Sequence, residues 1–203
     1  MEIERTMTEH IAEFKTDART VQVGYKQIGE GKPVLLLHGI PGSSKCWDPV
    51  TEILKAKSRL IVPALLGFGK SSRSEDIDEL WTVNQSNCVK QIADDLGIEK
   101  INVVGHDYGG PVALTMLAKN PGLIEKLVLI SSNTFVDTPI PFPLSGIFWP
   151  IIGRAWSKFL FSRPSLGMMV KNGFHSPSRK PDLSNYLGDA LQSKAIGTIF
   201  ELL

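Results

Sequence analysis

The fold is decided by residues 101–118, INVVGHDYGGPVALTMLA. A short apolar run of the kind found in a buried strand breaks at Gly105, and a helical pattern begins within a few residues. Too little chain is left between them for an ordinary loop, so Asp107 lies on a very tight strand-to-helix turn. Gly105 and Gly109 flank it two residues away on either side, where a Cβ atom would collide with the neighbouring strand or helix.

Asp107 has two interpretations in this position. An aspartate just ahead of a helix most often accepts hydrogen bonds from the first helical amides as an N-cap. The spacing also fits the Gly-x-Ser-x-Gly nucleophile elbow, with aspartate in place of serine. The rest of the chain has to decide between them.

The composition is that of an ordinary globular protein. With 203 residues, 42% of them apolar, the chain can build one domain or slightly more around a real core. A net charge of +1 without a basic cluster predicts neither nucleic acid nor a membrane as partner. The polar start of the chain, with charges of both signs, does not have the pattern of a signal or transit peptide, so we expect a cytoplasmic protein. Cys46 and Cys88 lie far apart, and we expect no metal and no cofactor.

Short apolar runs alternate with helical patterns along the first two thirds of the chain. Predicted strands are residues 21–25, 33–37, 59–62, 101–104 and 126–130; predicted helices are residues 45–56, 82–96 and the one that follows Asp107. Repeated crossovers of this kind predict an α/β fold, a mostly parallel sheet with helices on both faces. We expect residues 1–134 to form this core. Residues 135–203, rich in proline and aromatic residues, are predicted to form a helical cap over the carboxyl edge of the sheet.

Three motifs in this order resemble those of the α/β-hydrolase family. Residues 38–41, His-Gly-Ile-Pro, are similar to its oxyanion loop, residues 67–71 to its next loop, and residues 105–110 to its elbow. Within the family, the aspartate resembles the branch of epoxide hydrolases and haloalkane dehalogenases. The resemblance covers about residues 20–134. It implies that Asp107 is a nucleophile, with the backbone N–H groups of Ile40 and Tyr108 as oxyanion donors.

The sequence also departs from this branch. Dehalogenases usually have Asn or Glu at the position of Ile40 and Trp at that of Tyr108, so epoxide hydrolysis is the preferred prediction and dehalogenation the second. The family places its acid and its histidine after two further strands. The chain reaches neither strand, and we therefore expect an N-terminal fragment whose last strand, residues 126–130, forms an apolar edge.

The chemistry follows from the charge of the nucleophile. A carboxylate at a helix N-terminus is already ionised at neutral pH and attacks without a base. Attack on a tetrahedral carbon of a small apolar molecule, bearing a halide or an epoxide oxygen, gives an ester intermediate. Hydrolysis of that ester needs a general base, which the chain does not supply. The alternative is a non-catalytic α/β-hydrolase-like binding protein or a decayed gene product.

Four further residues are candidates for binding the substrate. They are His38, Tyr108, Trp149 and Tyr186. His38 alternatively shapes the oxyanion loop, and Tyr108 either points its hydroxyl at a leaving group or covers the elbow. Trp149 alternatively packs the cap onto the core. Tyr186 is a candidate acid for an epoxide oxygen, with an ordinary surface position as the alternative. The sequence leaves the oligomeric state open.

Overall fold

The structure is a computed structural model of the chain. It describes residues 7–16, 19–40, 42–73, 82–132, 142, 145–146, 149–160, 162, 164–165 and 167–168. Tyr186 lies outside the described residues, so its predicted role stays a prediction. The same holds for the division of the chain at residue 134.

The described strands form one six-stranded sheet in the order β1-β2-β4-β3-β5-β6. Their bounds are β1 Thr8–Lys15, β2 Thr20–Ile28, β3 Lys32–Leu37, β4 Ser58–Pro63, β5 Ile101–His106 and β6 Ile124–Ile130. Strands β4, β3, β5 and β6 are parallel, whereas β1 and β2 form an antiparallel hairpin that joins the sheet antiparallel to β4. The predicted mostly parallel α/β sheet is confirmed.

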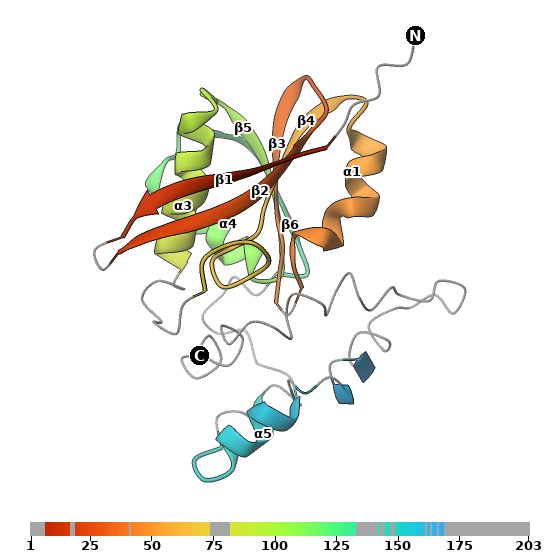
Figure 1. Ribbon diagram of the computed structural model, residues 1–203, viewed down its shortest axis with the longest axis vertical. Coiled ribbons are helices and arrows are strands. Elements are labelled where there is room, and N and C mark those ends of the chain that lie inside the picture. Colours follow the sequence, from red (N-terminus) through yellow and green to blue (C-terminus); the bar gives the residue numbers. More distant parts are fainter. Residues whose placement is uncertain are drawn as a thin grey trace.

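Helices cover both faces of this sheet. The 3-10 turn η1 (Ser44–Trp47) and helix α1 (Asp48–Leu54) lie on one face, and α3 (Thr82–Asp95) and α4 (Gly109–Lys119) lie on the other (Figure 1). Strand β3 shows why both faces must be covered. Leu35 and Leu37 pack in the cluster beneath α3 and α4, while Leu36 packs with Trp47 in the cluster on the α1 side. Successive side chains of a strand point to opposite faces of the sheet, so the apolar residues of β3 contribute to the hydrophobic core on each face.

Strand β6 forms where the sequence predicts it, and its apolar residues are partly exposed at the edge of the sheet. Val128, Leu129 and Ile130 are 50%, 40% and 41% exposed. Among the described residues β6 pairs with β5 alone, so its other side is an edge. A run of apolar residues indicates that burying the strand would be favourable. Whether the strand is buried depends on the helices and strands that pack against it. The expected apolar edge is present.

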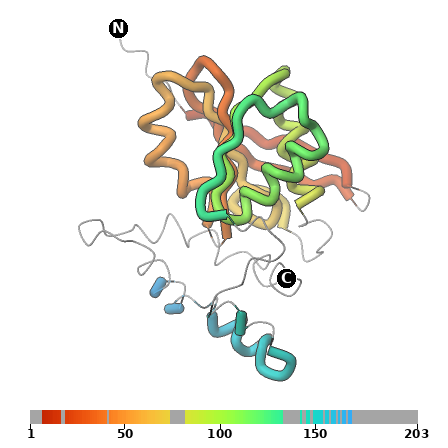
Figure 2. The backbone as a smooth tube through the Cα atoms, turned by 180° about the vertical axis from the view of Figure 1, so that it is seen from behind, coloured from red at the N-terminus to blue at the C-terminus, as the bar shows by residue number. Residues whose placement is uncertain are grey.

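Helix α5 (Gly153–Leu160) lies apart from the sheet, on the side where the parallel strands end (Figures 1 and 2). It is the longest helix in the described part of residues 135–203. No helix of the described ranges is long and apolar enough to span a bilayer.

Candidate active site

The turn between β5 and α4 holds Asp107 in a strained conformation. Its φ is +48°, a left-handed value that costs a non-glycine residue about 1–3 kcal/mol. Three hydrogen bonds to its backbone hold it there. The Asp107 N–H donates to the carbonyl of Ile130 at 3.0 Å, and its carbonyl accepts from Gly110 N–H at 3.0 Å and from Ser132 Oγ at 2.8 Å. The end of β6 therefore fixes the turn.

The two glycines around Asp107 have the function predicted for them. A Cβ atom on Gly105 would lie 2.6 Å from the carbonyl oxygen of Gly109, at the start of α4. A Cβ atom on Gly109 would lie 2.5 Å from the carbonyl oxygen of Leu37, at the end of β3. Both distances are far inside van der Waals contact, so the tight turn requires glycine at both positions.

The side chain of Asp107 does not cap the helix. The residue preceding α4, Tyr108, has no side-chain capping bond, and the Asp107 Oδ1 atom instead accepts a hydrogen bond of 2.7 Å from the backbone N–H of Ile40. Within the described part of the chain no partner bonds Oδ2. One carboxylate oxygen is therefore held by an amide from another loop, while the other is available in a partly exposed side chain.

The loop after β3 approaches Asp107 closely because residue 39 is glycine. A Cβ atom there would lie 2.4 Å from Asp107 Cβ and 2.6 Å from Oδ1. The missing side chain lets the Ile40 amide reach the carboxylate. Gly39 and Ile40 belong to the predicted oxyanion motif, and in the structure both lie against the side chain of Asp107.

His38 is fully buried beneath this loop, with 0% of its surface exposed. Its Nδ1 donates to the carbonyl of Gly39 at 3.0 Å, and its Nε2 accepts from the N–H of Leu65 at 3.0 Å. These partners place the ring proton on Nδ1, because a carbonyl can only accept and an amide N–H can only donate. From its position in the sequence, His38 was expected among the substrate-binding residues. Its burial and its two backbone partners fit the alternative, a residue that shapes the loop.

Two buried side chains that sequence reasoning missed hold the loop after β4. The Gln85 amide accepts from Leu66 N–H at 2.8 Å and donates to the carbonyl of the same residue at 3.1 Å. Ser71 Oγ donates to the carbonyl of Ala64 at 2.6 Å and accepts from Gly24 N–H at 3.0 Å. Ser132 was missed as well. A glutamine inside a helical pattern and single serines carry no signal in one sequence that marks them as supports of a site.

The other predicted binding residues are placed as follows. Tyr108 follows Asp107 in the chain, and burial raises the pKa of its hydroxyl well above the usual range, so the hydroxyl stays protonated. The role of its backbone N–H as an oxyanion donor stays a prediction. Trp149 is 45% exposed and packs against Trp156 in a tilted arrangement with a centroid distance of 5.9 Å, in the segment around α5.

A pocket of about 270 Å³ lies next to this region without including Asp107. It is formed by the β1–β2 hairpin, η1 and the loop after β4. Its lining residues are Glu9, His10, Gly24, Tyr25, Lys26, Ser44, Lys45, Ala64, Gly69 and Lys70.

The elbow, the approaching amide loop and the sheet order agree with a comparison to known protein families. The sequence model of the alpha/beta hydrolase fold matches residues 32–193. The chain belongs to the α/β-hydrolase family. The resemblance found in the sequence is thus confirmed at the level of the family.

Several curated α/β-hydrolase-like relatives match along most of this chain. An uncharacterised protein of Mycobacterium tuberculosis is 32% identical over 83% of the chain and 51% of its own length. The soluble epoxide hydrolase of Corynebacterium sp. is 28% identical over 77% of the chain and 57% of its own length. Haloalkane dehalogenase 2 of M. tuberculosis is 26% identical over 78% of the chain and 51% of its own length. The chain spans about half the length of the curated relatives it matches.

A solved structure of the same fold is similar to this α/β hydrolase throughout. The epoxide hydrolase CorEH superposes with a TM-score of 0.75 over 97% of this chain and 72% of that one, at 21% sequence identity. At 21% identity the superposition establishes the fold alone, and the chemistry has to be inferred from the residues of this chain.

Proposed function

We propose that this chain carries the nucleophilic part of a hydrolase of small apolar organic molecules, and that Asp107 forms an alkyl-enzyme ester. The observation that carries the proposal is the 2.7 Å hydrogen bond from Ile40 N–H to Asp107 Oδ1. It orients the carboxylate, which sits on a strained turn, and leaves Oδ2 to act as the attacking atom. An aspartate serving only the helix would instead bond the amides of α4.

In the first half-reaction, Oδ2 attacks a tetrahedral carbon of the substrate. A carbon–oxygen bond to Asp107 forms as the bond from that carbon to the epoxide oxygen or halide breaks, and the bonding electrons leave with the oxygen or the halide. An epoxide oxygen then needs a proton. The hydroxyl of Tyr108 stays protonated and is adjacent to the nucleophile, which makes it a candidate hydrogen-bond donor to that oxygen.

In the second half-reaction, water attacks the carbonyl carbon of the Asp107 ester. Negative charge then develops on the carboxyl oxygen that is not bonded to the substrate, which is the oxygen held by Ile40 N–H. The ground-state hydrogen bond is thus placed where the charge will increase. The Tyr108 backbone N–H is the second proposed donor.

The general base is not among the described histidines. His38 has both ring nitrogens on backbone groups, His106 packs edge-on against Trp47, and His10 stacks on Tyr25. None of these three is bonded to Asp107. We therefore expect the ester to accumulate on Asp107 in these 203 residues. Epoxides are the preferred substrates in this proposal, because Ile40 and Tyr108 occupy the positions at which haloalkane dehalogenases usually hold the halide.

Intact-protein mass spectrometry tests this proposal. Incubation with an aryl glycidyl ether should add the full mass of the epoxide, because the ring opens without a leaving group. A bromoalkane should add only its alkyl group, with bromide released, and peptide mapping should place either adduct on Asp107. Asp107→Asn should remove the adduct. Asp94→Asn, which changes a carboxylate paired with Lys90 on the surface of α3, should leave it unchanged. The absence of an adduct where a full-length relative reacts would favour the alternative, a non-catalytic binding protein.

A further inference from the structure

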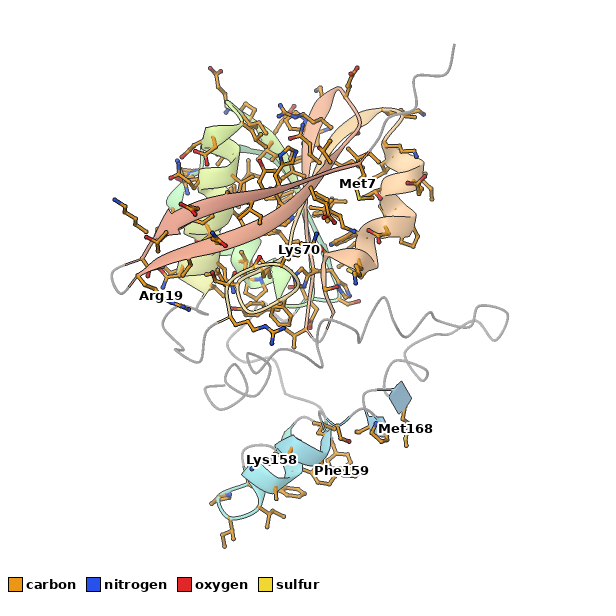
Figure 3. The ribbon with its side chains drawn as sticks, in the orientation of Figure 1. Met7, Arg19, Lys70, Lys158, Phe159 and Met168 are labelled. Carbon is orange, nitrogen blue, oxygen red and sulfur yellow. The ribbon has the colours of Figure 1, made fainter. Side chains whose placement is uncertain are left out.

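The described part of residues 142–168 concentrates large apolar side chains at the surface. Ile151 is 94% exposed, Phe142 66%, Met168 63%, Phe159 61% and Ile152 51%. Phe159 lies on α5 and Ile151 and Ile152 lie in the turn that precedes it. Figure 3 shows Phe159 and Met168 at the end of the molecule away from the sheet. Apolar side chains scattered singly over a surface need no explanation, but a group of this size in one short segment indicates an interaction surface.

This surface is built on a preformed aromatic cluster. The indole of Trp156 contacts Phe142, Trp149 and Phe159, with ring centroids 5.8, 5.9 and 5.6 Å apart. The turn at Gly146 packs directly on it, because a Cβ atom there would lie 2.6 Å from the indole Nε1. The rings therefore hold one another, and the outward-facing side chains are presented on a defined base rather than on separate loops.

The charged residues in and around the same segment are all basic. Between Asp137 and Asp182 the sequence contains no aspartate or glutamate and six basic residues: Arg154, Lys158, Arg163, Lys171, Arg179 and Lys180. The remaining chain carries the compensating excess of acidic residues, since the net charge of the whole is only +1. The expectation of no membrane partner rested on the net charge of the whole chain and on the lack of a contiguous basic cluster. The net charge averages this basic segment with the acidic excess of the remaining residues. Lys158 is exposed on α5, next in sequence to the exposed Phe159.

We propose that the segment around α5 docks on the surface of a membrane containing anionic lipids. Exposed Trp, Phe and Ile side chains beside basic residues are the combination that inserts shallowly into the interface between headgroups and acyl chains. Lysine and arginine side chains then reach the lipid headgroups, and each basic residue near an anionic surface contributes about fivefold in affinity. This placement brings the cap side of a hydrolase of apolar molecules to the phase in which such molecules collect. The docking surface does not depend on Asp107.

A protein partner fits these observations less well. A basic segment whose sequence contains no acidic residue complements a continuous negative surface, whereas protein interfaces usually intersperse both signs at a polar rim. The exposed side chains also lie on a short helix and on turns rather than in a groove shaped for a helix or strand.

Vesicle flotation with the full chain tests the proposal. Vesicles of phosphatidylcholine mixed with about one-third phosphatidylglycerol should carry the protein, while vesicles of phosphatidylcholine alone should carry at least about fivefold less. Ile151→Ser with Phe159→Ser should abolish flotation, and Lys158→Glu should reduce it about tenfold or more, because it both removes and reverses a charge. Raised salt should weaken binding of the parent chain.

Matched controls come from α1, on the opposite part of the core. Ile53 is 75% exposed and Lys57 is exposed just after the helix. Ile53→Ser and Lys57→Glu should float like the parent, and so should Asp107→Asn. The proposal is overturned if the chain does not float with anionic vesicles, if the α1 controls lower flotation as much as the α5 variants, or if the α5 variants instead dissociate a dimer. A missing ester in the labelling experiment leaves this result untouched, so the two proposals fail separately.

Discussion

Gly110→Ala is expected to destabilise the protein through contact with one side chain. The new Cβ would lie 1.7 Å from Ser132 Oγ and 2.6 Å from Ser132 Cβ, while the next atom, Leu129 Cδ2, is 3.5 Å away. Ser132 must move, and its 2.8 Å hydrogen bond to the Asp107 carbonyl is lost. Overpacking costs about 1–3 kcal/mol and the hydrogen bond about 1 kcal/mol, against a gain of up to about 1 kcal/mol for alanine over glycine in a helix. We expect a net loss of about 1–3 kcal/mol in the free energy of unfolding.

A second substitution isolates that contact. Ser132→Gly removes both colliding atoms, so in that background a Cβ at position 110 meets only Leu129 at an ordinary distance. Gly110→Ala should then be neutral or stabilising by up to about 1 kcal/mol. Urea denaturation of the four proteins gives the coupling energy, expected at about 2–4 kcal/mol because the overpacking and the lost hydrogen bond are both absent in the Ser132→Gly background. An equal cost of Gly110→Ala in both backgrounds would refute the reasoning.

Three further predictions concern the loops around the nucleophile and the core. Gly39→Ala places a Cβ 2.4 Å from Asp107 Cβ and should slow ester formation about 10²-fold by mass spectrometry; an unchanged rate would count against the loop geometry. His38→Ala leaves a buried amide and a carbonyl unpartnered and should cost about 2–4 kcal/mol in urea denaturation, whereas a cost below about 0.5 kcal/mol would contradict its assignment as a loop support. Burial raises the pKa of the Cys46 thiol from 9.0 to about 12. Because the unfolded thiol ionises first, this contribution to stability is lost as pH rises above 9.0, and iodoacetamide at pH near 8 should label Cys46 only after unfolding; rapid labelling of the folded chain would disprove it.

The sequence predicted those parts of the fold whose signal is local. Gly105 and Gly109 marked the turn because the absence of a side chain is itself the requirement, and the parallel strands showed apolar runs long enough to recognise. Strand β1 gave no such signal. Most of its residues are exposed and only Phe14 is buried, because it pairs with β2 alone at one side of the sheet. Its existence depends on pairing with β2, and periodicity does not reveal which segment of the chain pairs with a predicted strand.

The site was predicted to the extent that its residues lie in motifs. Asp107 and Ile40 were selected from two separate motifs, and they meet in one hydrogen bond. The supports were not predicted, because Ser132 and Gln85 act through distances between loops that no spacing encodes. His38 shows the opposite limit. A histidine next to a site suggests chemistry, and only coordinates reveal that both of its nitrogens are occupied by backbone groups.

The bond between Asp107 N–H and the carbonyl of Ile130 ties the elbow to an outermost strand of the sheet. Whenever β6 frays from β5, the amide proton of Asp107 loses its acceptor and becomes open to exchange with solvent. Deuterium uptake at this single amide therefore measures how often the edge opens. A molecule that adds a strand to β6 would slow this uptake and at the same time steady the carboxylate.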